Sequence, residues 1–514
     1  MATRTQNTMK NIVWGNISHI LELVIKFISR TIFIHYLGQT YMGVSGLYTN
    51  ILGVLSFTEL GLGTAMNFAL YKPVAEGNRE KVKSLMLFYK TAYRVIAFVI
   101  AALGLLIVPF LRYLIKDPGD IGNIYVYYLI FLFDTVTSYL VSYKFSLVSA
   151  EQKTYIMTNI NMVISLVQTS SQILIIIISK NFLLYLLTSS FVSLVSKFYI
   201  VYYFNKNYAY LNDNPRKIEK SELDPIKKNT AALIVHKIGD VCVHQTDNIL
   251  ISAFISVEIV GKISNYNYII MTVTGFLSVV FGAVIGSLGN LVASEGKEHQ
   301  YKVFKTYRFV GYWLYGFCAI AYFILFQPFI YIWAGEEWLV DDLTVALICL
   351  ERYNIGHRVV VNNFKSAAGL FNQDKWCAFG QAIINLIVSV VMVKLIGLPG
   401  IYVGTVVQGL LATIVKPYVL YKYGFDRKVA PYYIDSLKYF GVELATAIFL
   451  MWIKSLVLPD LIGVNMGRFI ALVALTAVIP NMFFLFAFHK TEEFHYLYEL
   501  VGKKGINKIK RLFS

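Results

Sequence analysis

Long apolar segments recur along the whole chain, and this feature constrains the fold more than any other. A helix that crosses a lipid bilayer needs roughly 20 mostly apolar residues. Only 15% of the 514 residues are charged, whereas soluble domains average about 25%. The sequence therefore predicts an all-α polytopic membrane protein of about 14 transmembrane helices. The predicted spans are 11–37, 41–70, 83–113, 122–150, 155–179, 182–204, 228–255, 258–293, 303–332, 340–369, 375–396, 399–422, 436–458 and 465–488.

Basic residues cluster in alternate connections between these spans. The clusters fall in 72–83, 206–228, 297–305, 422–428 and 490–511, whereas the intervening connections contain few lysines or arginines. Because cytoplasmic loops are enriched in lysine and arginine, we expect these segments and both termini to be cytoplasmic. The net charge of +16 then reflects topology and attraction to anionic lipid headgroups. It gives no support for a nucleic acid partner.

Neither a metal site nor a removed signal peptide is indicated. The four cysteines lie in or beside apolar segments, without the spacing of a metal site, so we expect small buried residues and no metal. The polar segment 1–10 has no small-residue cleavage site, which favours a first membrane span over a signal peptide.

The two halves of the chain resemble each other at a nearly constant offset of 218 to 221 residues. Six predicted spans separate the copies, so both copies face the same way across the bilayer. Two unrelated halves are the alternative, but a parallel repeat is favoured, in which two lobes enclose a cavity at the bilayer midplane. The matched pairs include Gly43 with Gly261, Tyr48 with Tyr266, Tyr93 with Tyr312, Pro109 with Pro328 and Lys144 with Lys365.

This repeat predicts two six-helix lobes related by pseudo-twofold symmetry, plus two extra C-terminal helices. The predicted boundaries are 1–205 for the N-lobe, 206–227 for a cytoplasmic linker, 228–422 for the C-lobe, and 423–514 for the last two spans and a cytoplasmic tail. In that tail, Phe494 and Leu497 stand at helical spacing beside lysines, which predicts a short helix at the membrane surface.

Ionisable residues also occur inside the predicted spans, where each costs about 2.5–3.5 kcal/mol on insertion scales. Their spacing of three or four residues places several on one helix face. The first span contains Glu22, Lys26 and Arg30, the seventh His236, Asp240, His244 and Asp247, and the tenth Glu351, Arg352, Arg358 and Lys365, while Glu59, Asp134 and Glu443 are isolated acids.

Each of these polar faces has a structural and a functional interpretation. Glu22 and Lys26 suit a local ion pair, and the face of the seventh span suits either a polar seam between helices or a relay for cations or protons. In the tenth span three cations accompany a single acid, and surplus positive charge in a cavity requires an anion. We expect a cationic cavity that binds phosphate or pyrophosphate, since guanidinium groups bind phosphate bidentately and stay charged when buried. Its predicted lining is Arg30, Lys26, Arg352, Arg358 and Lys365, and the candidates for coupling or a polar seam are Asp247, Asp240, His236, His244, Glu22 and Glu59.

Short motifs in order along the chain resemble one membrane protein family. These are Ser29–Phe33, Glu59–Gly63 and Leu70–Pro73 near the start, Thr246–Ser252 and Ser264–Tyr266 in the middle, and Ala368–Phe371 and Pro417–Gly424 toward the end. Together they resemble Wzx-type oligosaccharide flippases of the multidrug/oligosaccharidyl-lipid/polysaccharide (MOP) exporter superfamily.

The resemblance implies export of a polyprenyl-pyrophosphate-linked oligosaccharide by alternating access across a bacterial cell membrane. The glycan would serve capsule, O-antigen or teichoic acid synthesis, with glycan-assembly enzymes as possible partners. It also implies no ATP hydrolysis and no cofactor beyond a coupling ion such as Na⁺ or H⁺. By motif position, only Arg30 and Asp247 take family roles.

Three alternatives remain. A drug or cation antiporter of the MATE type on the same fold would favour acids over cations in its cavity. An integral-membrane polysaccharide-assembly enzyme would need an acceptor site on the outer face, commonly in a large loop, and the outer loops predicted here are short. An uncoupled lipid scramblase would use the same cavity. We therefore expect a transporter and not an enzyme.

Overall fold

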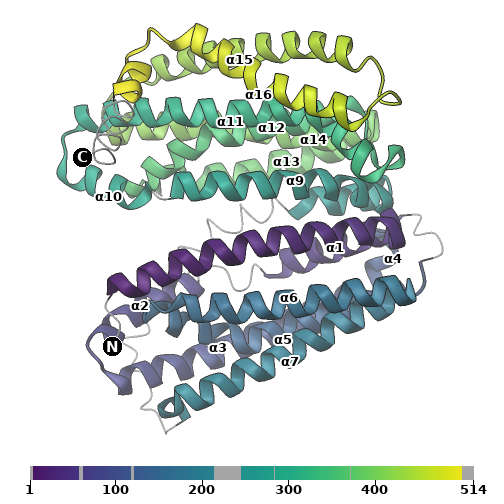
Figure 1. Ribbon diagram of the computed structural model, residues 1–514. Helices are drawn as coiled ribbons and strands as arrows, with labels where there is room; N and C mark the ends of the chain where they lie inside the picture. The colour runs from purple at the N-terminus through teal and green to yellow at the C-terminus, as the bar shows by residue number, and fades with distance from the viewer. Residues whose placement is uncertain are drawn as a thin grey trace, which may run out of the picture. The chain divides into compact units, whose positions relative to one another are not determined.

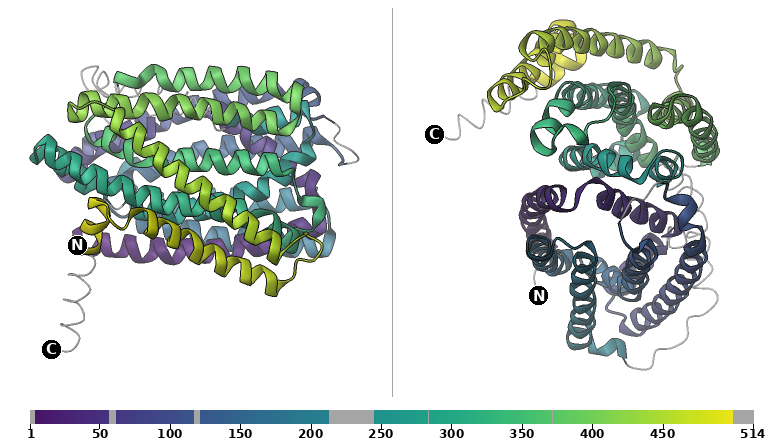
Figure 2. Two further views of the ribbon diagram at one scale, coloured as in Figure 1. Left: turned by 90° about the horizontal axis from the view of Figure 1, so that it is seen from above. Right: turned by 90° about the vertical axis from the view of Figure 1, so that its right-hand side faces the viewer.

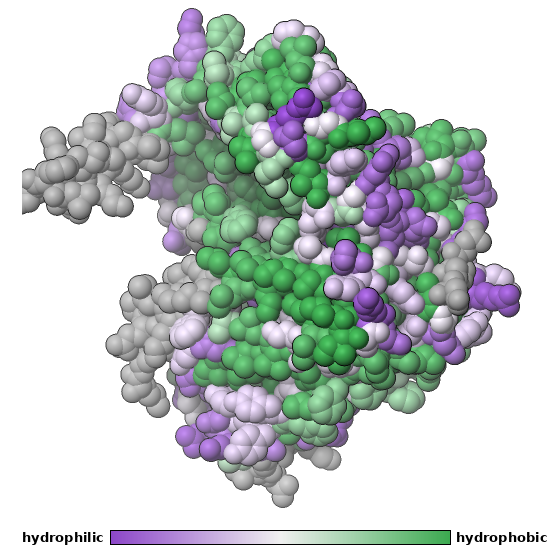
Figure 3. Space-filling view, turned by 45° about the vertical axis from the view of Figure 1, so that its right-hand side comes forward, coloured by the Kyte–Doolittle hydropathy of each residue, from purple (hydrophilic) through white to green (hydrophobic). Residues whose placement is uncertain are grey.

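The computed structural model describes residues 4–56, 62–116, 121–212, 245–282, 284–370 and 372–499. Within these ranges all regular secondary structure is helical, and ten helices are long and apolar enough to cross a membrane (Figure 1). The prediction of an all-α polytopic membrane protein is confirmed. Large apolar side chains at mid-helix positions, such as Phe98, Ile448 and Val478, are exposed, and much of the surface in Figure 3 is apolar. These surfaces suit contact with lipid.

The chain divides into two compact units, Met1–Ser264 and Asn265–Ser514. The division falls inside helix α9 (Val257–Gly282). The linker predicted at 206–227 lies mostly outside the described residues. Seen end-on in Figure 2, the helices of each unit are viewed roughly along their axes, as in a helical bundle.

Unit 1 is built around the long helix α1 and a bundle of shorter helices. Helix α6 packs on α1 and α7, and α5 packs on α2, α3 and α7. These are α1 (Arg4–Leu55), α2 (Leu62–Ala75), α3 (Arg79–Ile107), α4 (Leu111–Leu114), α5 (Ile124–Ala150), α6 (Thr154–Ser179), α7 (Phe182–Asn207) and a helix over 245–254.

Helix α1 contains both the first predicted span and part of the second. Gly38 has φ 78° and ψ −169°, so it marks a kink between two helical halves. Glycine reaches positive φ without a Cβ clash. The expected connection between spans 11–37 and 41–70 is therefore a kink at Gly38, and the second predicted span continues into α2.

Unit 2 contains the remaining helices, whose boundaries lie close to the predicted ones. Helix α12 packs on both α11 and α14, while α15 and α16 pack on each other and on α11. After α9 these are α10 (Ile285–Ser294), α11 (Lys297–Ala334), α12 (Asp342–Ala367), α13 (Lys375–Ile396), α14 (Leu398–Val419) with a π-helical turn Leu420–Phe425, α15 (Ala430–Val457) and α16 (Met466–Phe488).

Helices α13 and α14 form a hairpin with a polar interior. Gln381 Nε2 donates to Gln408 Oε1 at 2.6 Å, and Ser389 Oγ donates to the carbonyl oxygen of Ile401 at 3.0 Å. All of these side chains are buried. A Cβ at Gly404 would overlap with Ser389, so the two backbones lie unusually close. Small residues permit such close packing between membrane helices, and buried side-chain hydrogen bonds stabilise it.

The C-terminal segment packs against unit 2. Glu493 forms an ion pair with Lys305 at 2.7 Å, and the ring of Phe494 stacks on that of Trp313 with centroids 6.3 Å apart. Phe494 and Leu497 are packed against the buried core between α11 and α16. Protein therefore covers part of the apolar face of this segment, and its place at the membrane surface stays a prediction.

Candidate functional site

The polar face predicted for the tenth span lies on α12. Asp341 caps this helix by accepting a hydrogen bond from the Thr344 amide at 2.8 Å. Glu351, Arg358 and Lys365 are all less than a tenth exposed. Buried charges in a membrane helix are costly unless each has a partner. The partners of each charge therefore decide what the face can bind.

Of the two guanidinium groups on this face, only one forms an ion pair within the described part of the chain. Arg352 forms that ion pair with Glu351. Arg358 donates to the carbonyl oxygen of Gly409 on α14 and forms no ion pair with a described residue. One carboxylate cannot neutralise two guanidinium groups, so this part of α12 keeps a surplus positive charge.

Lys365 is neutralised by a partner that the sequence analysis did not count. Its ammonium group forms a buried ion pair with Asp374, which lies in the short turn Asn372–Asp374 after α12. The prediction considered only acids within the span and found Glu351 alone. The predicted surplus of positive charge is therefore smaller by one, and Lys365 is the weakest of the three α12 candidates.

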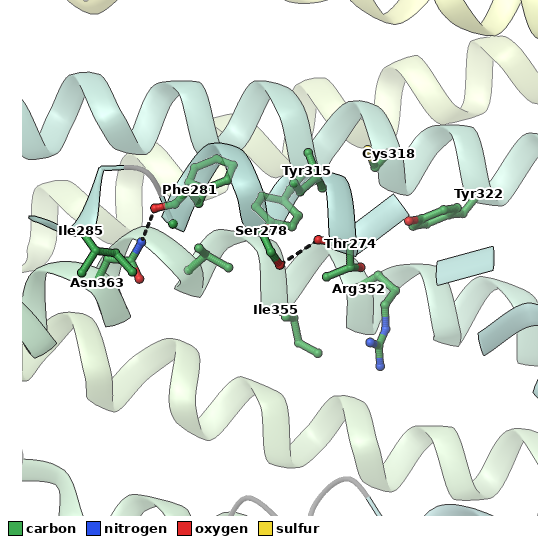
Figure 4. A pocket seen from close by; sticks show the side chains of 13 residues that line it. Thr274, Ser278, Phe281, Ile285, Tyr315, Cys318, Tyr322, Arg352, Ile355 and Asn363 are labelled. Atoms are coloured by element: carbon green, nitrogen blue, oxygen red, sulfur yellow. Dashed lines mark hydrogen bonds between the residues drawn. The ribbon is translucent and has the colours of Figure 1, made fainter. Parts of the chain in front are cut away.

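A pocket of about 290 Å³ lies beside Arg352. Its walls come from α9, α10, α11 and α12, all within unit 2 (Figure 4). The aromatic side chains of Phe281, Tyr315 and Tyr322 form part of the wall, and Asn363 donates to the carbonyl oxygen of Phe281 at 3.5 Å. Arg352 is the charged residue among those that line this pocket in the described structure, and none of them is an acid.

The candidates of the first span lie on α1 in unit 1. Arg30 donates to the hydroxyl of Ser264 at 2.6 Å. Lys26 lies 2.7 Å from Glu22, and the Lys26 side chain is 51% exposed. The local ion pair considered for Glu22 and Lys26 is thus present in the structure. Arg30 forms a long-range contact, whereas Lys26 binds a neighbour one turn away.

Asp247 lies in the helix over 245–254, which contacts α1 through amide side chains. Asn50 donates to Gln245 Oε1 at 2.7 Å, and Asn248 donates to Asn50 Oδ1 at 3.0 Å. Asp247 lies between Gln245 and Asn248 in the chain, and its Oδ1 is buried. The remaining candidates of this group, His236, Asp240, His244 and Glu59, lie outside the described residues.

Comparison with known proteins shows which solved structures have a similar fold. No family model and no curated protein matches the chain. Among solved structures, the chain is similar to an inward-facing multidrug resistance MATE family transporter of the MOP superfamily, with a TM-score of 0.62 and 13% identity over 79% of this chain and 96% of that one. It is equally similar to the lipid II flippase MurJ in an inward closed conformation, with a TM-score of 0.62 and 13% identity over 93% of this chain and 99% of that one. The chain has the MATE–MurJ fold.

A third structure with the MATE–MurJ fold is a complex of the MATE multidrug transporter DinF-BH, at a TM-score of 0.58 and 14% identity over 80% of this chain and 94% of that one. The shared fold agrees with the multi-pass membrane architecture predicted from the sequence. At such low identity the fold does not indicate a substrate. The substrate has to be inferred from the side chains of this chain.

Within the MATE–MurJ fold, the structure also reveals a buried arginine that the sequence analysis did not select. Arg308 on α11 donates to the carbonyl oxygen of Tyr432 at 2.9 Å and to Ser436 Oγ at 2.7 Å. Its guanidinium carbon lies 3.7 Å from the centroid of the Tyr432 ring. The available signal was an arginine five residues inside the predicted ninth span, 303–332. Because these bonds fasten α15 to α11, Arg308 has a structural role.

Proposed function

We propose that this protein is an alternating-access flippase in a bacterial cell membrane, with both termini in the cytoplasm. Its substrate would be a polyprenyl-pyrophosphate-linked oligosaccharide for capsule, O-antigen or teichoic acid synthesis, carried to the outer leaflet. The observation that carries this proposal is that α12 holds two guanidinium groups, of which only Arg352 forms an ion pair among the described residues, beside a pocket lined by Arg352 and by no acid in the described structure.

The chemistry of this region suits an anionic sugar lipid. A guanidinium group binds phosphate oxygens through two parallel hydrogen bonds and keeps its charge. Aromatic side chains such as Tyr315 and Phe281 offer flat surfaces against which a sugar ring can pack. A volume of about 290 Å³ is near the lower limit for ligand pockets. It would hold a headgroup fragment and leave the lipid tail outside.

The remaining candidates are ranked by their side-chain chemistry. Arg352 and Arg358 of unit 2 are the proposed contacts to the pyrophosphate, and Arg30 is the proposed phosphate-binding residue of unit 1. Lys26 and Lys365 are weaker candidates, because each pairs with a carboxylate and a lysine lacks the bidentate geometry of a guanidinium group. Asp247 is the proposed coupling residue for Na⁺ or H⁺, with Asp240, His236, His244, Glu22 and Glu59 as secondary candidates. Contact with glycan-assembly enzymes would deliver the substrate, and the protein itself would make no covalent change.

Export of a cationic drug is the second candidate function. Similarity to the multidrug transporter DinF-BH and the aromatic wall of the pocket favour it. The surplus guanidinium charge opposes it, since like charges repel in a medium of low dielectric constant.

Flipping in proteoliposomes tests the proposal. The purified protein would be reconstituted with a fluorescent polyprenyl-pyrophosphate oligosaccharide, and exposure of the label on the opposite leaflet would be followed with a membrane-impermeant quencher. We expect fast flipping by the wild type. Flipping by Arg352→Gln should fall about tenfold or more, because a charge-assisted hydrogen bond contributes about 1.5–3 kcal/mol.

Arg112→Gln is the matched control, since Arg112 is an exposed arginine on α4. It should flip the lipid at the wild-type rate. Parallel vesicles containing a cationic rhodamine dye test the alternative function. Transport of the dye without flipping of the sugar lipid would replace the proposal with drug export, and equal flipping by Arg352→Gln and wild type would remove Arg352 from the site.

A further inference from the structure

Glu443 is a buried carboxyl group that the proposed transport site does not use. It stands at the middle of α15 and is 6% exposed. Both of its carboxyl oxygens are buried and have no hydrogen-bond partner in the described part of the chain. The sequence analysis noted it only as an isolated acid.

The carboxyl group lies against a glycine of the neighbouring helix. A Cβ added to Gly316 on α11 would lie 2.6 Å from Glu443 Oε2. Gly316 therefore leaves the space that the carboxyl group occupies. This contact joins α11 to α15, two helices that pack on each other within unit 2.

The groups near Glu443 on the neighbouring helices include tyrosine and cysteine side chains. Tyr312 and Cys318 of α11 and Tyr353 of α12 lie close enough for a charge on Glu443 to interact with them. The hydroxyls of both tyrosines are buried without partners in the described residues. On α15 itself Tyr439 stacks on Tyr312, with ring centroids 4.1 Å apart.

Of the positive or potentially positive groups nearby, Arg308 is engaged elsewhere, whereas His357 has no hydrogen-bond partner at Nε2 among the described residues. Arg308 of α11 directs its guanidinium to Tyr432 and Ser436, with Asp435 3.9 Å away. His357 of α12 lies against aromatic rings, with its centroid 4.4 Å from that of Tyr353. On α16 the charged residue is Arg468, in the first turn, and His489 follows the last residue of the helix.

An ionised carboxylate in this place would be unfavourable by several kcal/mol, because it would lose its hydration and gain no counter-charge. A carboxyl group with its proton is neutral and avoids that cost. A metal ion is disfavoured, since the described residues contain no cluster of three or more acidic, histidine or cysteine side chains that could hold one.

We propose that Glu443 is a proton-binding site, occupied while α15 packs on α11. Release of the proton would create a carboxylate without a partner against Gly316, so release requires the two helices to separate or water to enter. Proton occupancy and the packing of these helices are then thermodynamically linked. This inference does not depend on the identity of the transported substrate.

Infrared difference spectroscopy of the full-length protein in lipid nanodiscs tests the site directly. Wild type at neutral pH should show the carbonyl stretching band of a protonated carboxyl group. Glu443→Gln keeps the shape without a titratable proton, and it should lose that band. Glu336→Gln is the control, because Glu336 is an exposed acid in the turn after α11, and it should keep the band. A band that persists in Glu443→Gln, or is absent from wild type, would overturn the proposal.

Thermal unfolding gives a second, independent readout. If the carboxyl group is neutral in the folded protein and ionises on unfolding, wild type should lose stability as the pH rises from mildly acidic to alkaline values. Glu443→Gln should lose markedly less over the same range. Identical pH profiles for the two proteins would contradict proton binding, and stabilisation of wild type by NaCl but not by KCl would assign the site to Na⁺ instead.

Neither measurement includes the sugar lipid. A failure of flipping in proteoliposomes would leave the spectroscopic result intact, and a missing carboxyl band would leave the flipping result intact.

Discussion

Gly43 on α1 and Gly261 on α9 face each other in a reciprocal contact within unit 1. A Cβ on Gly43 would overlap with the carbonyl oxygen of Val257, and a Cβ on Gly261 would overlap with that of Gln39. Each carbonyl belongs to the residue four positions before the facing glycine. The same pairs are related by the offset of 218 residues found in the sequence. A twofold-related repeat produces such a contact, since residue i meets j as j meets i.

Alanine at either glycine should push the two helices apart. For Gly43→Ala we expect a loss of about 1–3 kcal/mol, the usual cost of overpacking, seen as a lower thermal unfolding temperature in detergent. Gly441→Ala is the control, because a Cβ there meets nothing within 4 Å. Alanine favours a helix over glycine by roughly 1 kcal/mol, so this control should be neutral or stabilised. Equal temperatures for Gly43→Ala and Gly441→Ala would argue against the close contact.

Variants of the Lys365–Asp374 ion pair test whether Lys365 has a structural role or binds the substrate. Lys365→Met leaves a buried carboxylate without its partner, which should cost about 3–5 kcal/mol. The double variant Lys365→Met/Asp374→Leu removes both charges and should recover most of that stability. A double-mutant cycle of unfolding free energies measures the difference. If the stable double variant still flips the sugar lipid, Lys365 is structural, whereas loss of flipping would return it to the binding site.

Arg308 should not tolerate lysine. Lysine keeps the charge but lacks the planar group that reaches Tyr432 and Ser436 together and lies over the Tyr432 ring. We expect Arg308→Lys to cost about 2 kcal/mol or more, on the scale of lost charged hydrogen bonds. Its unfolding temperature would be compared with that of Lys438→Arg, a substitution at an exposed position on α15. Wild-type stability in Arg308→Lys would show that a point charge suffices.

Lys26 and Arg30 should differ in their effect on transport although they lie one turn apart. Lys26 is half exposed and already pairs with Glu22, and exposed pairs contribute only about 0.2–1 kcal/mol. Lys26→Gln should therefore flip the sugar lipid at nearly the wild-type rate. Arg30→Gln should reduce flipping about tenfold or more, on the same reasoning as for Arg352. Equal rates in the two variants, measured at matched protein density, would contradict the assignment of Arg30.

Much of the fold follows from hydropathy because membrane helices must be long and apolar. The sixth and thirteenth helices, Thr154–Ser179 and Lys375–Ile396, begin and end within one residue of predicted spans 155–179 and 375–396. The kink at Gly38 escaped prediction, since a single glycine between two apolar runs suits a loop equally well. The packing of Phe494 on Trp313 also escaped, because amphipathic spacing does not reveal whether lipid or protein covers the apolar face.

The candidate site was harder to predict, since a charge is judged by partners that are distant in sequence. Spacing correctly placed Glu351, Arg358 and Lys365 on buried positions of one helix. It did not show that Asp374 neutralises Lys365, because that acid lies outside the span. Glu443 looked like any isolated acid, and only the fold brings it against Gly316. Periodicity predicts which residues share one face of a helix, whereas function depends on the groups that contact that face in the folded protein.

The α13–α14 hairpin has a consequence for how unit 2 can rearrange. Buried hydrogen bonds such as Gln381 to Gln408, together with the backbone contact at Gly404, tie the two helices along their length. Separating the two helices would leave several amide and hydroxyl groups without hydrogen-bond partners in a nonpolar medium. The pair should therefore move as one rigid body in any rearrangement of unit 2, and spin labels on α13 and α14 should keep a fixed separation.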